Sequence, residues 1–216
     1  MAIRINDTIP NIHVSTDQGD LDLHEWIGDS WAILFSHPKD FTPVCTTEFS
    51  AVAKLDDEWK SRNTKVIGVS VDSVEDHKKW KKDIEAYGNH KPSFPIISDI
   101  DLVVSKAFDM LPSEAYLPDG RTPNDTATVR SVFIIGPDKK LKLSMTYPMT
   151  VGRNFAEVIR ALDALQLSTN KGVATPADWQ LGQDVIIPAA IDDDEAEKKF
   201  GSFKKALPYL RKVNLS

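Results

Sequence analysis

Residues 31–48 read WAILFSHPKDFTPVCTTE, a stretch that combines an apolar run, a polar loop and the start of a helix. The apolar run 31–36 predicts a buried strand. Thr42 is a favoured helix N-cap and Pro43 is favoured at the first helical position, so Cys45 should be the third residue of a helix. Apolar residues at helical spacing extend this helix to about residue 62: Phe49, Val52, Leu55 and Trp59. The strand and helix together place the helix start at the carboxyl edge of a sheet, where open α/β sheets bind ligands.

Cys45 is the only cysteine among 216 residues. A free cysteine is often a buried, small apolar residue, and this is the alternative to any chemical role. In the first turn of a helix, however, unpaired N–H groups and the positive end of the dipole stabilise an anion. A thiolate is therefore favoured there, and we expect Cys45 to be a reactive nucleophile.

The pattern Pro38-x-x-x-Thr42-x-x-Cys45 resembles the active-site signature of the peroxiredoxins, which are thiol peroxidases with a thioredoxin-like fold. The similarity covers nearly the whole chain. Its segments are 66–72, 94–97, 129–135, 147–148, 152–154 and 173–179. The last two segments and the single cysteine resemble the one-cysteine, peroxiredoxin-6-like branch in particular.

Strand-like and helix-like patterns alternate along the chain. Further short apolar runs occur at 66–71, 94–98, 131–135 and 141–146, and amphipathic helices are predicted at about 74–87 and 153–167. This order predicts an α/β protein with a mixed central sheet flanked by helices. The pattern alone also fits other three-layer folds, whereas the resemblance implies a thioredoxin-like fold. We expect a peroxidase domain at 1–167 and a small C-terminal α+β domain at 168–216.

The C-terminal segment alternates charged runs with the apolar stretches 185–188 and 207–210. It is too short to be expected to bury these stretches alone, so they should need a partner surface. The resemblance implies a small dimerisation and lid domain that reaches across a homodimer toward the other subunit's active site.

The composition indicates which compartment and which partners the protein is expected to have. The chain is 41% hydrophobic with a formal net charge of −6 and a pI of about 5.4, as in compact soluble proteins. A single cysteine gives no internal disulfide and hence no sign of an oxidising compartment. Without a signal core or a membrane-spanning stretch, a cytoplasmic protein with no stable membrane insertion is predicted. The acidic balance also argues against nucleic acid as a partner.

Peroxide reduction requires an ionised sulfur and a group that stabilises the oxygens as the O–O bond breaks. Cys45 would be the nucleophile, Thr42 can direct its hydroxyl into the same pocket, and Pro38 can shield the sulfur from water. The resemblance implies Arg130 as the essential arginine, whose rigid fork of donors suits a peroxide oxygen and a thiolate together.

Three further residues are candidate supports for this site. Glu48 can orient an arginine through a bidentate pair, and Arg153 matches a second cation of the family. The alternative for both is an ordinary surface salt bridge. His37 could hydrogen-bond near the sulfur or could fix the loop. No ligand spacing for a metal is found among the other histidines: His13, His24, His77 and His90.

The predicted function is reduction of hydrogen peroxide and organic hydroperoxides through a Cys45 sulfenic acid, in antioxidant defence. No cofactor is expected, and an external thiol such as glutathione or another dithiol must restore Cys45. A redox sensor or chaperone would use the same cysteine.

The family also suggests a phospholipase A2-like hydrolase with Ser30, His24 and Asp138. Ala32 breaks the G-x-S-x-G elbow in this chain, and Ser30 precedes a strand instead of following one.

Overall fold

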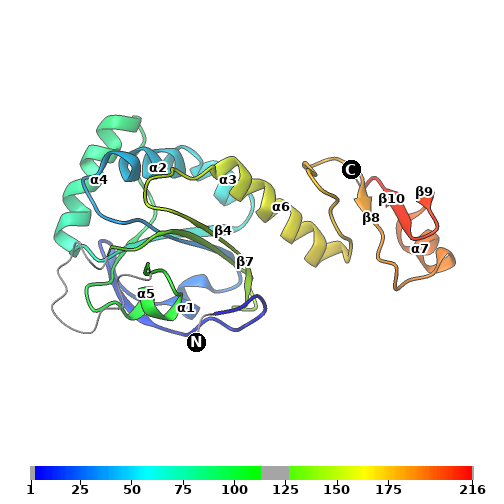
Figure 1. The fold of residues 1–216 in the computed structure, drawn as a ribbon, viewed down its shortest axis with the longest axis horizontal. Helices are drawn as coiled ribbons and strands as arrows, with labels where there is room; N and C mark the ends of the chain where they lie inside the picture. Colours follow the sequence, from blue (N-terminus) through cyan, green and yellow to red (C-terminus); the bar gives the residue numbers. More distant parts are fainter. Residues whose placement is uncertain (1–2, 113–126, 216) are drawn as a thin grey trace. The chain divides into compact units, whose positions relative to one another are not determined.

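The computed structural model describes residues 3–112 and 127–215, and it divides the chain into two compact units, Met1–Arg153 and Asn154–Ser216 (Figure 1). The first unit contains β1 (His13–Thr16), β2 (Gly19–Asp22), α1 (Leu23–Ile27), β3 (Trp31–Ser36), α2 (Pro43–Lys54), α3 (Asp56–Ser61), β4 (Thr64–Ser70), α4 (Val74–Gly88), β5 (Ile96–Ser98), α5 (Val103–Ala107), β6 (Arg130–Ile135) and β7 (Leu141–Tyr147). The second contains α6 (Phe155–Lys171), β8 (Val185–Ile186), α7 (Asp193–Phe200), β9 (Lys204–Leu207) and β10 (Leu210–Val213). The domain boundary expected after residue 167 falls inside α6, which groups with the second unit, and it stays a prediction.

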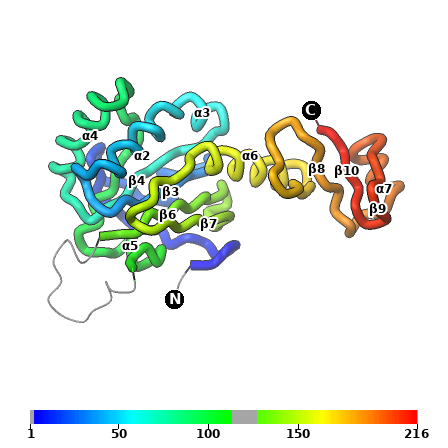
Figure 2. Tube along the Cα trace, turned by 45° about the horizontal axis from the view of Figure 1, so that its top comes forward, coloured from blue at the N-terminus to red at the C-terminus, as the bar shows by residue number. Residues whose placement is uncertain are grey.

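A seven-stranded mixed sheet organises the first unit. Its strand order is β2-β1-β5-β4-β3-β6-β7, and β4, β3, β6 and β7 lie side by side in Figure 2. Strand β3 pairs in parallel with β4 and antiparallel with β6. The predicted mixed sheet flanked by helices is therefore confirmed, with the strand of residues 31–36 near its centre.

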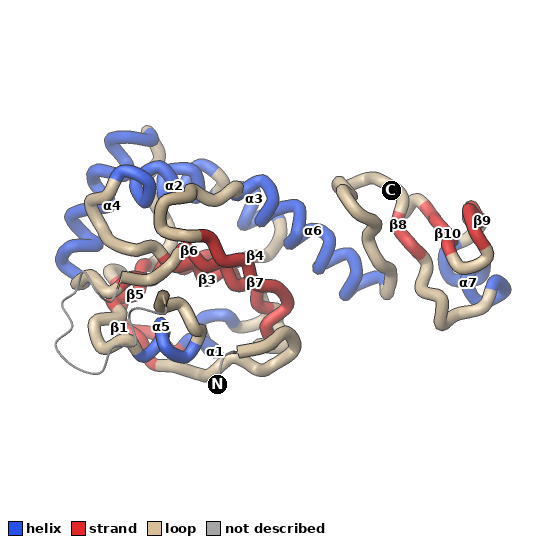
Figure 3. Tube along the Cα trace, in the orientation of Figure 1, coloured by secondary structure: helices blue, strands red, loops and turns tan. Residues whose placement is uncertain are grey.

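Strand β3 is buried along its whole length because helices cover both faces of the sheet. Leu34 belongs to the apolar cluster that includes residues of α1 and α5. On the opposite face, Phe35 packs against Phe49 of α2 with a ring separation of 4.7 Å. Figure 3 shows α2 beside α4 on this second face. This double cover explains why the strand reads as a continuous apolar run.

The register of β6 decides which side chains reach the carboxyl end of β3. Phe35 of β3 lies opposite Val132 of β6 in the antiparallel ladder. Arg130, two residues earlier in β6, therefore lies beyond the end of β3. Arg130 also pairs with Tyr147, the last residue of β7. The loop after β3, the start of β6 and the chain after β7 consequently meet at one edge of the sheet.

The start of α2 confirms the expected N-terminus, with Thr42 as N-cap in an extended conformation and Pro43 at the first helical position. The side chain of Thr42 makes no capping bond, however, and its hydroxyl donates to the carbonyl of Lys39 at 2.9 Å.

The helix expected to run to residue 62 is instead two helices. Leu55 separates α2 from α3. The next three residues are acidic, which favours a new helix start there. Trp59 of α3 still contacts α2, because its indole N–H donates to the carbonyl of Val52 at 3.1 Å.

The second unit has a three-stranded antiparallel sheet, in the order β8-β10-β9, together with α6 and α7. Its small core contains Val173, Trp179, Val185, Ile187, Ala196 and Val213. The expectation that this segment cannot bury its apolar stretches alone is therefore wrong for 185–188, because the unit supplies its own core around Trp179. It holds for 207–210, where Leu207 is 44% and Tyr209 is 72% exposed.

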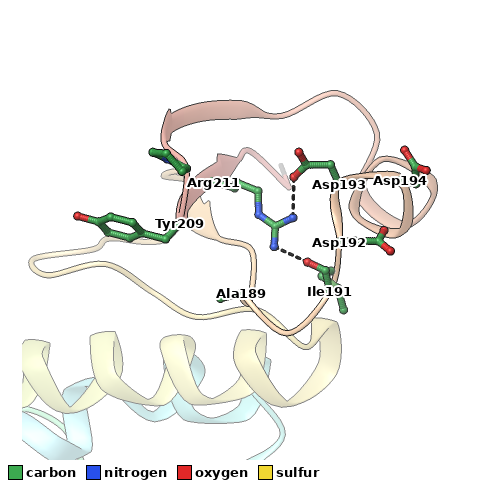
Figure 4. Close-up of a pocket in the computed structure, with 8 residues that line it drawn as sticks. Ala189, Ile191, Asp192, Asp193, Asp194, Tyr209 and Arg211 are labelled. Carbon is green, nitrogen blue, oxygen red and sulfur yellow. Dashed lines mark hydrogen bonds and ion pairs between the residues drawn. The ribbon is translucent and has the colours of Figure 1, made fainter.

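A pocket of about 550 Å³ lies in the second unit, between the start of α7 and β10 (Figure 4). Arg211 points into the loop before α7 and donates to the carboxylate of Asp193 at 2.9 Å and the carbonyls of Pro188 and Ile191. This buried guanidinium links β10 to the start of α7.

In the part of the chain that the structure describes, no helix combines the length and apolar character needed to cross a bilayer.

Candidate active site

Cys45 is fully buried at the start of α2, where it is the third helical residue. Arg130, from the first position of β6, donates through Nη1 to the Cys45 Sγ at 3.3 Å. The two residues are 85 positions apart in sequence, and the antiparallel register of β3 and β6 brings them together. A guanidinium at this distance can stabilise negative charge on the sulfur.

Arg130 is held in place from two sides. The same Nη1 that faces the sulfur donates to Glu48 Oε2 at 2.7 Å, and Nε donates to the carbonyl of Met149 at 2.8 Å. Glu48 lies on α2, three residues after Cys45, so the helix that carries the thiol also orients the arginine that faces it. The predicted pairing of Glu48 with an arginine is present.

Arg153 binds the same carboxylate more extensively. Its backbone N and Nε donate to Glu48 Oε1 at 2.8 and 2.9 Å, and Nη2 donates to Oε2 at 2.7 Å. Its Nη1 donates to the carbonyls of Ser36 and Ser131 at the ends of neighbouring strands. The guanidinium also lies 5.2 Å from the centre of the Phe35 ring. The network of Glu48, Arg130 and Arg153 is buried, which excludes the ordinary surface salt bridge.

The electrostatics of this network follow from its burial. Burial alone would raise the pKa of Glu48, but the hydrogen bonds and positive charge of Arg153, with the charge of Arg130, hold it below its usual value. Burial lowers the pKa of Arg153, against the opposing effect of Glu48. Two guanidiniums share one carboxylate, so these three side chains carry a surplus of one positive charge beside the sulfur.

The rest of the signature lines the loop between β3 and α2. Pro38 is buried in this loop, and Thr42 at its end is partly exposed. The Thr42 hydroxyl donates to Lys39, so its oxygen is left to accept a hydrogen bond. The roles expected for Pro38 and Thr42 toward the sulfur and the peroxide stay predictions.

His37 is buried, but it does not hydrogen-bond to the sulfur. Its Nε2 contacts Asp40 Oδ1 at 2.6 Å, whereas Nδ1 has no hydrogen-bond partner. Asp40 in turn contacts His77. Of the two alternatives for His37, this geometry fits a residue that fixes the loop. Sequence reasoning missed Asp40 and His77, although Asp40 lies inside the signature and His77 lies in the helix predicted at about 74–87.

The three hydrolase candidates have different partners. The Ser30 hydroxyl donates to Asn63 Oδ1 at 3.0 Å, and His24 Nε2 contacts the carbonyl of Ile9 at 2.8 Å. The carboxylate of Asp138 pairs with Lys142. Ser30 follows α1 and precedes β3, so the strand-turn-helix elbow is absent at this point as well. The geometry gives the hydrolase hypothesis no support.

Glu48→Gln should destabilise the protein strongly, because it leaves two buried guanidiniums without their shared negative charge. We expect the free energy of unfolding in urea at neutral pH to fall by about 3 kcal/mol or more. Since the pKa of Glu48 is lowered by folding, its contribution is present above its unfolded pKa of about 4.3 and is lost as the pH falls through the folded value. The difference in the free energy of unfolding between wild type and variant should therefore become smaller below about pH 4.

Glu157→Gln is the matched control, because Glu157 pairs with Arg160 at the partly exposed start of α6. This variant should lose less than about 1 kcal/mol. A Glu48→Gln protein as stable as wild type at pH 7, or a gap that widens in acid, would contradict the network described here.

Two family models match the chain in line with its two units. The model of the AhpC/TSA family matches residues 5–144, and the model of the C-terminal domain of 1-Cys peroxiredoxin matches residues 164–202. The first match covers more than half of the chain and contains Cys45, Glu48 and Arg130.

Curated relatives align over almost the full length. The chain is 50% identical over 212 residues to the mitochondrial peroxiredoxin PRX1 of Saccharomyces cerevisiae, covering 97% of this chain and 80% of the relative. It is 49% identical over 220 residues to peroxiredoxin-6 of Gallus gallus, with 97% and 96% covered.

Solved structures agree with this placement. The yeast mitochondrial 1-Cys peroxiredoxin superposes with a TM-score of 0.89 at 48% identity, covering 98% of this chain and 99% of the other. The C45S mutant of peroxiredoxin 6 from Arenicola marina gives a TM-score of 0.91 at 42% identity, covering 100% and 99%. The chain belongs to the AhpC/TSA family, in its 1-Cys peroxiredoxin branch, and it is a thiol-dependent peroxidase.

Proposed function

We propose that Cys45 is the nucleophile of this peroxidase and that Arg130 stabilises both the sulfur and the breaking O–O bond of hydrogen peroxide or an organic hydroperoxide. The contact that supports this assignment is the 3.3 Å approach of Arg130 Nη1 to Sγ. Because Glu48 and the Met149 carbonyl hold the guanidinium, its donors are preorganised before the substrate arrives.

The reaction transfers one oxygen atom. The thiolate attacks the terminal oxygen of the peroxide, an S–O bond forms and the O–O bond breaks, and the electron pair leaves with hydroxide or alkoxide. That anion takes a proton to give water or an alcohol, while Cys45 becomes a sulfenic acid. Arg130 would stabilise the charge that develops on the leaving oxygen. Thr42 would accept a hydrogen bond from the peroxide, and Pro38 would keep bulk water from the sulfur.

An external thiol must return the enzyme to its starting state, because the chain has one cysteine. The thiolate of the reductant attacks the sulfenic sulfur, the S–O bond breaks, and the departing hydroxide takes a proton to give water, which leaves a mixed disulfide. A second thiolate then attacks the reductant's sulfur in this disulfide, which forms the oxidised reductant and releases the Cys45 thiolate. The structure of the yeast mitochondrial 1-Cys relative is described in terms of glutathione/thioredoxin systems. On this basis we favour glutathione or a dithiol protein as the reductant, with no bound cofactor.

Arg130→Ala should slow Cys45 oxidation by hydrogen peroxide by about 100-fold or more, as expected when a preorganised charged donor is lost. Cys45→Ser should abolish the reaction in a folded protein. Stopped-flow fluorescence gives the rate constant, and Arg62→Ala is a control that removes an arginine paired with Glu58 at the end of α3. Wild-type rates in Arg130→Ala or Cys45→Ser would rule out the assigned roles.

Without a reductant, the first equivalent of hydrogen peroxide should convert Cys45 of each subunit to the sulfenic acid, and turnover should stop there because no second cysteine can resolve it. Excess peroxide should then produce sulfinic and sulfonic acids, detected by intact mass as added oxygen atoms. A dithiol should reduce the sulfenic acid back to the thiol but should leave the sulfinic and sulfonic acids unchanged. If a disulfide-linked Cys45 dimer were the main product in dilute solution, a redox sensor would become the better assignment.

We also propose that the enzyme acts as a homodimer. Leu207 and Tyr209 leave an exposed apolar surface at the β9–β10 hairpin, which a second chain would cover. Wild type should sediment as a dimer at micromolar concentration, and replacing both residues with serine should weaken it. A monomeric wild type under these conditions would refute the proposal.

The cytoplasm stays the expected compartment, on the ground that Cys45 is a free thiol. Because the yeast relative is named as mitochondrial, cell fractionation has to decide between the two compartments.

A further inference from the structure

The carboxylate of Asp40 is buried between two imidazoles. His37 Nε2 approaches Oδ1 at 2.6 Å, and His77 Nδ1 approaches Oδ2 at 2.6 Å. The second nitrogen of His77 lies 3.1 Å from the carbonyl of Ile97. Neither imidazole is exposed, and Asp40 is 3% exposed. His37 and Asp40 come from the signature loop and His77 comes from α4. We call these three side chains the relay, and it joins the loop to the helix.

Counting donors fixes the protons in the relay. A carbonyl can only accept, so His77 Nε2 carries a hydrogen toward Ile97. Each of the two short contacts of Asp40 needs one proton, and an ionised carboxylate supplies none. His37 therefore donates through Nε2, and His77, which already donates to Ile97, donates through Nδ1 as an imidazolium. The Nδ1 of His37 is then best left unprotonated, because a buried N–H without an acceptor would be costly. Burial lowers the pKa of His37, opposed by Asp40, in agreement with a neutral ring.

The relay is attached to the machinery around Cys45. The His37 ring packs against Phe49, one turn after Cys45 on α2, at 4.5 Å, and stacks on Trp80 of α4 at 4.9 Å. The His37 carbonyl accepts the hydroxyl of Thr128, two residues before Arg130. A shift of His37 would therefore disturb both the cysteine helix, through the ring, and the segment that leads to Arg130, through the carbonyl.

A cation site is the competing interpretation. His37, Asp40 and Asp72 place potential ligand atoms within 4.8 Å of one another, the one grouping of this kind in residues 3–112 and 127–215. Both carboxylates are already engaged, however. Asp40 binds two imidazoles, and Asp72 accepts the backbone N–H of Asp40 and the hydroxyl of Ser70. These bonds account for the cluster as a hydrogen-bonded relay.

We propose that His77 is a positioning residue for the peroxidase reaction: it holds Asp40, which fixes His37 as its Nε2–H tautomer and sets the signature loop around Cys45. The inference rests on the proposed role of Cys45. It concerns geometry, since the same loop carries Pro38 and Thr42, the two residues that are proposed to act beside the sulfur. Displacing reacting groups by about 1 Å can cost about 100-fold in rate.

Two substitutions separate this role from a merely structural one. The amide of His77→Asn can occupy the position of Nδ1 and donate to Asp40, but it loses Ile97. The longer side chain of His77→Gln can reach Ile97, but it loses Asp40. Each variant keeps one of the two buried hydrogen bonds, so a structural role predicts similar losses of stability and of rate in both.

The proposal predicts different outcomes for the two variants. In stopped-flow oxidation by hydrogen peroxide, His77→Asn should retain most of the wild-type rate constant, and His77→Gln should lose about 10-fold or more. Thermal melts of both variants serve as the control for folding. Equal slowing in the two variants, or a wild-type rate in His77→Gln, would overturn the proposal.

Nitrogen-15 NMR of the imidazoles gives a readout that does not depend on the variants. In the wild type, His37 should show an unprotonated Nδ1 and a protonated Nε2. A protonated Nδ1 at neutral pH would overturn the proposal even if His77→Gln failed to fold.

The pH dependence of the same resonance adds a second test. The charged and titratable groups that face His37 are Asp40, Asp72 and His77. The electrostatic effect of His77 lowers the pKa of His37, so replacing His77 should move protonation of His37 to higher pH. If the His37 imidazole titrated at the same pH in wild type and in both variants, the interaction of His77 with His37 through Asp40 would be contradicted. Loss of rate in Arg130→Ala together with normal rates in His77→Gln would refute this inference and leave the proposed function intact.

Discussion

The site depends on the carboxylate of Glu48, which binds two buried guanidiniums at once. Without it, Arg130 and Arg153 would be like charges close together in a region that excludes water, where an unpaired charge is costly. With it, both arginines are held by short, charge-assisted hydrogen bonds, and one of them faces the sulfur of Cys45. The carboxylate lies on the same helix as the thiol, so the nucleophile and its cation form one unit.

The sheet supplies the geometry that this carboxylate needs. Strand β6 runs antiparallel to β3, which brings Arg130 to the carboxyl end of β3, and β7 returns the chain to the same edge before Arg153. The two carbonyls that accept from Arg153 belong to the ends of these strands. A slip of β6 by one residue would turn Arg130 to the other face and separate it from the sulfur. The apolar cover on both faces of β3 is therefore a requirement of the site as well as of the fold.

Local sequence signals predicted the local part of the site. Thr42 and Pro43 marked the helix start, which placed Cys45 at the third helical position. This prediction succeeded because helix capping depends on neighbouring residues alone. Arg130 and Arg153 were expected from the resemblance, and Glu48 was expected because a carboxylate on this helix can pair with an arginine. Their shared carboxylate could not be read from spacing, since it depends on strand register across 82 to 105 residues.

Other features were missed for similar physical reasons. The hairpin of β1 and β2 carries little apolar alternation, and the acidic run after Leu55 ended α2 early. The relay of His37, Asp40 and His77 joins a loop to a helix, so no sequence pattern links its members. In the C-terminal segment, Trp179 gives a short chain enough apolar surface to bury Val185 and Ile187.

A double-mutant cycle on the rate constant of Cys45 oxidation tests the central claim most directly. Glu48→Gln and Arg153→Met would each be measured alone and together by stopped flow with hydrogen peroxide. If Glu48 and Arg153 act as one unit that orients Arg130, the double variant should be about as slow as the slower single variant. If the two losses instead multiply, the residues act independently, and the shared carboxylate is not the interaction on which the site depends.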